Sequence, residues 1–180
     1  MPAISWVCYG LNDFLLRNEY IKNSNLSQTH KKIKVKKLKQ SLAFCEGLVE
    51  RDNFLRYYFD ESTSIEEKIP FDIRRLQAIA YPMATVLTVM FYTQQNASLS
   101  EVIQILRGSN RFLYHYYNLE QYSIYGRYTY SSISFWRYTI CLMIAADLVE
   151  VSNCGQVLRF TAHSLTFLKK LHQPLLRNNS

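Results

Sequence analysis

The last third of this 180-residue chain constrains its fold most, because the hydrophobic pattern there changes from helical to strand-like and back. Residues 131–146 have the apolar spacing of a helix. Residues 147–160 predict a β-hairpin, since alternating apolar residues flank a polar turn that contains Asn153 and Gly155. Thr161 can cap a second helix that runs to Leu171. We therefore expect a mainly α-helical protein with one small hairpin.

The order helix, hairpin, helix resembles the second half of a winged-helix domain. Winged-helix regulators often end with a Leu-Val-Glu strand, a short polar wing, a Thr, and a helix with Leu-x-x-Leu spacing. The corresponding residues here are Leu148-Val149-Glu150, Gly155, Thr161, Leu165 and Leu168. One departure is Ser164, which stands where a Gly commonly follows the Thr by three residues. The resemblance implies a winged-helix-like domain that binds double-stranded DNA.

The region before this segment has the signals of two further helices. Residues 72–92 are expected to form the first, kinked or begun again near Pro82. Ser98 and Glu101 have the spacing of a capping box, and Gly108 follows the apolar residues of the short helix that they would begin. This is where a helix-turn-helix places its second helix.

An aromatic-rich insertion, residues 111–130, then separates the second helix from the third. It forms either an extra helix or a decoration of the compact motif. Its aromatic residues are Phe112, Tyr114, Tyr116, Tyr117, Tyr122, Tyr125, Tyr128 and Tyr130. These rings could stack on exposed bases, form a partner interface, or pack against the chain's own core.

The amino-terminal part contains a first helical pattern over residues 1–22, a polar break, and a second pattern over residues 40–59. Residues 60–70 are polar and end in Pro, which makes them the best candidate boundary. The predicted division is a helical extension with a basic segment (1–70), a winged-helix-like domain (71–173) and a tail (174–180).

A lysine cluster dominates the charge of the chain. The formal net charge is +7, and six lysines lie within residues 31–39: Lys31, Lys32, Lys34, Lys36, Lys37 and Lys39. Such a cluster neutralises phosphates without reading sequence. It could equally be a solvated face, a localisation signal, or a contact with an anionic membrane surface.

The winged-helix resemblance assigns roles within residues 131–146. Trp136, Ile140 and Met143 would face the core. The outward residues near the start of the helix would be Ser132, Ser134, Arg137 and Tyr138. Serine and arginine there suit contacts with phosphates and base edges, because the amino end of this helix enters the major groove. Arg127 and Arg159 complete the predicted DNA-binding residues.

The second half of the same helix is apolar nearly all round, since Cys141, Leu142 and Ile144 would also point partly outward. A helix of that kind is covered. The cover would be the amino-terminal helices, the aromatic-rich insertion or another subunit. The apolar surface also leaves open a second reading, in which the winged helix docks a protein partner.

Other classes of function find little support in the sequence. The histidines lack metal-ligand spacing, the cysteines form no Cys-x-x-Cys pair, and there is no glycine-rich phosphate loop. We expect no catalytic residue, metal or cofactor. The apolar stretch 78–92 is shorter than the about 20 residues that cross a bilayer, so we expect a buried helix there and no integral membrane span.

The sequence therefore favours a cytoplasmic protein that binds double-stranded DNA, nucleoid-associated or nuclear according to its source. We expect it to act as a transcriptional or plasmid-maintenance regulator, and as a homodimer. The alternative is an adaptor that docks a partner protein. A small helical enzyme or a membrane-surface protein is the third hypothesis.

Overall fold

The computed structural model describes residues 9–59, 73–152 and 156–168. The chain divides into two compact units, Met1–Asp72 and Ile73–Ser180. Each unit is described by itself below.

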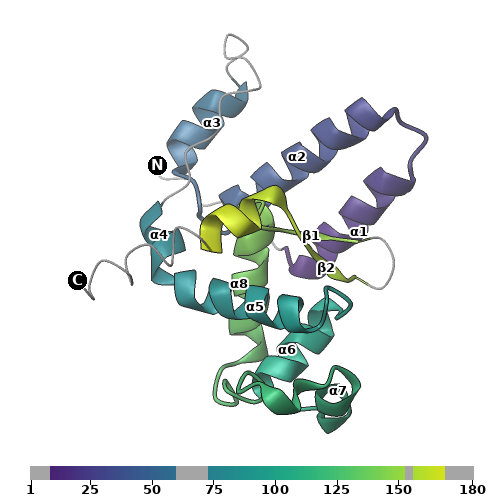
Figure 1. Ribbon diagram of the computed structural model, residues 1–180. Helices are drawn as coiled ribbons and strands as arrows, with labels where there is room; N and C mark the ends of the chain where they lie inside the picture. Colours follow the sequence, from purple (N-terminus) through teal and green to yellow (C-terminus); the bar gives the residue numbers. More distant parts are fainter. Residues whose placement is uncertain (1–8, 60–72, 153–155, 169–180) are drawn as a thin grey trace. The chain divides into compact units, whose positions relative to one another are not determined.

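A helical hairpin forms the main part of the first unit. Helices α1 (Leu11–Asn23) and α2 (Gln28–Cys45) pack side by side, and α3 (Arg51–Phe59) follows (Figure 1). The turn between α1 and α2 is fixed by hydrogen bonds: the Ser24 hydroxyl donates to the carbonyl of Ile21, and Nζ of Lys31 donates to the carbonyl of Lys22 at 2.7 Å. The lysine cluster thus lies on α2.

The predicted helices of this unit differ from the observed ones. Among the described residues the first helix begins at Leu11, and residues 1–8 of its predicted span lie outside them. The second pattern is not one helix over 40–59, because α2 ends at Cys45. Gly47 then adopts φ 65°, a left-handed conformation that ends helices. Two buried residues, Leu48 and Val49, lead to α3.

The second unit confirms the predicted fold class, mainly α with a small hairpin. Its main helices are α4 (Ile73–Ala78), α5 (Ala80–Tyr92), α6 (Leu99–Arg107) and α8 (Ile133–Ala145). Strands β1 (Val149–Val151) and β2 (Leu158–Phe160) pair antiparallel, with Val149 opposite Phe160. Residues 162–168 are helical again (Figure 1).

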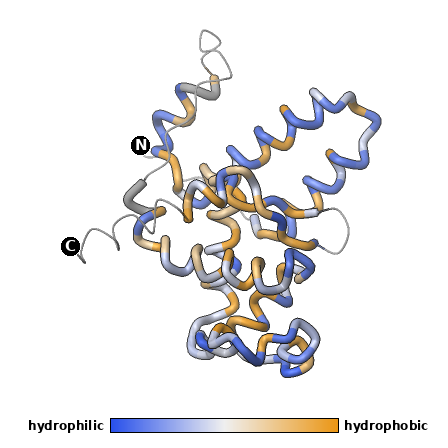
Figure 2. Tube along the Cα trace, viewed as in Figure 1, coloured by the Kyte–Doolittle hydropathy of each residue, from blue (hydrophilic) through white to orange (hydrophobic). Residues whose placement is uncertain are grey.

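The core of this unit is built from α5, α6 and α8, each of which carries side chains with almost no exposure. Fully buried examples are Met83, Leu87, Ile105, Leu106, Trp136 and Leu142. In Figure 2, α2 of the first unit is mostly hydrophilic, whereas α8 is mostly hydrophobic. Burying side chains of this size gives about 1.5–3 kcal/mol each, so the three helices are held together chiefly by packing.

Helix ends follow the local signals. Ser98 caps α6 by accepting a hydrogen bond from Glu101 N, and the Glu101 carboxylate accepts one from Ser98 N at 2.7 Å. Gly108 ends α6 with φ 65°. The first long helix is interrupted at Ile79 and begins again as α5, with Pro82 in its first turn, where no helical N–H is needed.

The aromatic-rich insertion forms α7 (Arg111–Tyr116) and a single 3₁₀ turn, η1 (Leu119–Gln121), before it returns to α6. The return is made by backbone: the N–H of Gly126 donates to Ile105 O at 2.9 Å, and that of Tyr128 donates to Leu106 O at 3.0 Å. The insertion is thus an addition to the compact motif, and backbone hydrogen bonds hold it to the carboxyl end of α6.

Ser164 ties the last helical segment to the base of the hairpin. Its fully buried hydroxyl donates to the carbonyl of Leu148 and accepts from Thr161 N at 2.9 Å. The Thr161 hydroxyl donates to Asp147 O at 2.6 Å, which ties the start of this helical segment to a residue just before the hairpin. The glycine that is common at this position in winged-helix proteins has no hydroxyl and could make neither of the two Ser164 hydrogen bonds.

No helix in the described part of the chain combines the length and the apolar character that crossing a bilayer requires.

Candidate nucleic-acid interface

Helix α8 exposes only its amino-terminal turns. Ser132 caps it by accepting a hydrogen bond from Phe135 N at 3.0 Å. The exposed side chains of the helix are Ile133, Ser134, Arg137 and Tyr138. From Thr139 to Ala145 every residue is buried. All four residues that the sequence placed outward, Ser132 included, are accessible.

The inward side of α8 agrees with the sequence. Trp136, Ile140 and Met143 are each 0% exposed, as expected for core positions. Leu142 and Ile144, which were expected to point partly outward beneath another part of the protein, are buried as well. The helix therefore presents a polar patch on a rigid, deeply packed element, which is the arrangement that precise recognition needs.

Aromatic contacts fix the start of α8 against α5. The ring of Tyr128 meets Trp136 edge-on at 5.2 Å, and its hydroxyl lies 3.2 Å from Thr85 Oγ1. Burial raises the pKa of the Tyr128 phenol above its ordinary value. Nε1 of Trp136 is buried without a hydrogen-bond partner among the described residues.

Arg107 was missed by the sequence reading. Its Nε donates to the carbonyl of Ser131 at 3.1 Å, so it holds the residue that precedes the α8 cap. A single arginine at the end of a short helix gives no signal that would reveal this role. Arg127, which the sequence proposed for DNA, is exposed in the insertion next to Tyr128.

The hairpin presents one further predicted contact. Arg159 is exposed on β2, directly opposite the exposed Glu150 of β1, whereas Val149, Val151 and Leu158 are buried. The outer face of the wing thus carries one residue of each charge. The predicted wing residue Gly155 lies outside the described residues.

Helix α2 distributes the lysine cluster over two flanks. Lys32 and Lys36, four residues apart, share one exposed flank, and Lys34 and Lys37, three apart, share another. Lys31 and Lys39 are half-buried. The lysine cluster therefore occupies two flanks of one helix, because helical geometry turns the side chains to different sides.

The rings of the insertion divide into two sets. The rings of Tyr114 and Tyr125 pack against each other at 4.9 Å, and Tyr117 donates a hydrogen bond to Glu101 at 3.5 Å. Burial, and secondly the charge of Glu101, raise the pKa of Tyr117 to about 12. The exposed set is Phe112, Tyr116, Tyr122 and Tyr130. Core packing thus accounts for part of the aromatic excess.

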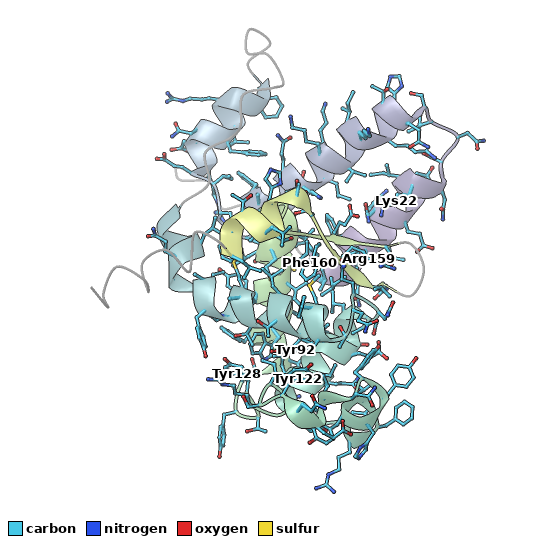
Figure 3. The ribbon with its side chains drawn as sticks, in the orientation of Figure 1. Lys22, Tyr92, Tyr122, Tyr128, Arg159 and Phe160 are labelled. Atoms are coloured by element: carbon cyan, nitrogen blue, oxygen red, sulfur yellow. The ribbon has the colours of Figure 1, made fainter. Side chains whose placement is uncertain are left out.

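A pocket of about 400 Å³ lies where the carboxyl end of α5, the insertion and the end of β2 meet. Figure 3 shows Tyr92 and Tyr122 together there, with Phe160 nearby. No sequence pattern pointed to it, because its lining comes from segments far apart in the chain. Among the described residues, no three His, Cys, Asp or Glu side chains gather as metal ligands would.

Comparison with protein families shows to which family this domain belongs. The model of the RQC domain matches residues 76–179, more than half of the chain. The chain belongs to the RQC domain family. The matched region contains α5, α6, the insertion, α8 and the hairpin, so the expected winged-helix resemblance is confirmed at the level of this family. No curated protein matches the sequence.

The RQC domain is a winged-helix-like DNA-binding domain of the carboxyl-terminal region of RecQ-type helicases. Family membership therefore supports nucleic-acid binding.

Proposed function

We propose that the chain binds double-stranded DNA through the RQC domain, with the amino-terminal turns of α8 in the major groove. The observation that carries the proposal is the contrast within α8: Ser134, Arg137 and Tyr138 are exposed, whereas everything from Thr139 onward is buried. A helix whose later residues are all buried can enter a groove only by its amino end.

Each exposed group has a chemical role to match. The Arg137 guanidinium can bind guanine O6 and N7, or a phosphate, through two parallel hydrogen bonds. The Ser134 hydroxyl lies on the first turn, where the helix amino end favours a phosphate. Arg159 on β2 and Arg127 in the insertion add positive charge for the backbone.

The lysines of α2 would supply affinity that is independent of sequence. Four of them are exposed, and each phosphate contact makes binding weaker as salt rises. A solvated face, a contact with an anionic membrane surface and a localisation signal are the alternative roles of the cluster, and a cytoplasmic location stays a prediction.

A regulatory role in transcription or plasmid maintenance and action as a homodimer are finer parts of the hypothesis. The RQC match bears on neither, so both stay predictions, together with the expectation that the chain has no catalytic or cofactor site. The adaptor alternative is favoured by one observation: Phe112 and Tyr116 stack at 5.6 Å while both remain more than 60% exposed. Tyr supplies contact area at low entropic cost.

Fluorescence anisotropy with a labelled duplex tests the proposal. Arg137→Ala should weaken binding by about 10-fold, within the 1–3 kcal/mol of one good bidentate contact. Arg111→Ala is the matched control, because Arg111 is also exposed in this unit and its replacement removes the same charge. Equal effects of the two variants, or no duplex binding at low salt, would contradict the proposal.

A further inference from the structure

The pocket beside the hairpin has a lining suited to a flat, uncharged ring. It is formed by Met90, Phe91, Tyr92, Gln94, Gln95, Tyr122 and Phe160. None of these side chains is charged at neutral pH, so the pocket has no group that would select a phosphate or a carboxylate.

Two tyrosines make a stacking platform in this pocket. The ring centroids of Tyr92 and Tyr122 are 3.7 Å apart, and the two rings are inclined by 19°. The ring of Phe91 meets that of Tyr92 edge-on, with a centroid distance of 5.8 Å. Tyr122 is 37% exposed and Phe91 68% exposed, so the stack is open to solvent. A third flat ring could extend it.

The amide groups of the pocket are held in a strained turn. Gln94 and Gln95 have φ values of 52° and 56°, a left-handed conformation that non-glycine residues rarely adopt, and here two occur in succession. Such strain is concentrated at functional sites. Oε1 of Gln95 accepts a hydrogen bond from Phe160 N at 2.7 Å, which locks the turn to β2.

Gln94 differs from its neighbour because its side-chain amide has no hydrogen-bond partner among the described residues and is exposed. It therefore offers one donor and one acceptor at the rim of an aromatic stack. Glutamine pairs with adenine through its N6 and N7 atoms.

We propose that this pocket holds one unstacked nucleobase, preferably adenine, which extends the Tyr92–Tyr122 stack while Gln94 binds its edge. The inference rests on the proposed DNA binding and adds to it a site for a base that has left the helix. Stacking on aromatic side chains tolerates every base, so Gln94 supplies the selectivity.

The test compares two labelled duplexes that differ only by one unpaired adenine. The full chain should bind the bulged duplex at least about 5-fold more tightly, since stacking of one base is worth about 5- to 150-fold. Tyr122→Ala should abolish this preference and leave binding of the paired duplex unchanged. Tyr122→Phe should keep it, because the ring remains.

Two controls complete the design. Tyr130→Ala removes a fully exposed tyrosine of the same insertion that does not line the pocket, and it should leave the preference intact. Gln94→Asn shortens the amide in a residue type that tolerates the left-handed turn. It should reduce the preference for an unpaired adenine over an unpaired thymine.

Photo-crosslinking of a single-stranded oligonucleotide with 5-iodouracil provides a readout that does not depend on duplex binding. Crosslinks should map to Tyr92 or Tyr122. If the paired duplex does not bind but these crosslinks form, the major-groove proposal fails and the pocket stands. Equal affinity for both duplexes, or a preference that survives Tyr122→Ala, overturns the pocket proposal and favours an aromatic side chain of a partner protein as its occupant.

Discussion

A Cβ atom on Gly108 would lie 2.7 Å from Cα of Gly126, so the end of α6 and the returning insertion approach at a distance that no larger residue allows. Both glycines are left-handed, with φ of 65° and 67°. The contact lets the backbone of the insertion reach the last carbonyls of α6, as the hydrogen bond from Gly126 N to Ile105 O shows.

Gly108→Ala should therefore lower the free energy of unfolding by about 2–5 kcal/mol. Left-handed strain costs about 1–2 kcal/mol and overpacking about 1–3 kcal/mol. Gly10→Ala is the control, because a Cβ there meets only the Asp13 carboxylate at 3.6 Å. Urea denaturation of both variants measures the difference, and equal losses would show that the two backbones are not in contact.

Ser164 should contribute to stability through its two buried hydrogen bonds. Ser164→Ala leaves the carbonyl of Leu148 and the N–H of Thr161 without this partner, and each unsatisfied buried group costs about 1–3 kcal/mol. Ser134→Ala, on the exposed turn of α8, should change stability by less than about 0.5 kcal/mol. Thermal melting distinguishes the two, and similar melting temperatures would contradict the network.

The two lysine flanks of α2 should differ in their effect on DNA binding. One side of a helix meets a duplex, so only one of the pairs Lys32/Lys36 and Lys34/Lys37 should contact phosphates. Replacing the contacting pair with Gln should flatten the slope of log affinity against log salt by about 1.8, at about 0.9 per contact. The other pair is the control. Unchanged slopes in both double variants would favour a merely solvated helix.

Leu142 tests how the apolar half of α8 is covered. It is 0% exposed, so Leu142→Asp should destabilise a core formed within one chain by several kcal/mol. Leu165→Asp, at a site that is 61% exposed, is the control. Light scattering and thermal melting measure both. A variant that melts at the temperature of the unmodified protein would contradict a core formed within one chain.

The sequence by itself determined the elements whose signals are local. The capping box of Ser98 and Glu101, the stop at Gly108 and the alternation around β1 and β2 each depend on residues a few positions apart. The core face of α8 was predicted from the winged-helix resemblance, which places Trp136, Ile140 and Met143 inward, and all three are buried. The lysine flanks were not predicted, because a run of lysines indicates a cluster of charges but not the helix that turns the side chains to different sides.

Only the tertiary structure decided the contacts between distant segments. The hydrogen bond between Gln95 and Phe160 spans 65 positions, and the Tyr92–Tyr122 stack joins α5 to the insertion. No periodicity or motif encodes such pairs, because their geometry follows from how the packed core positions whole elements. The candidate pocket therefore became visible only once α5, the insertion and β2 had been placed together.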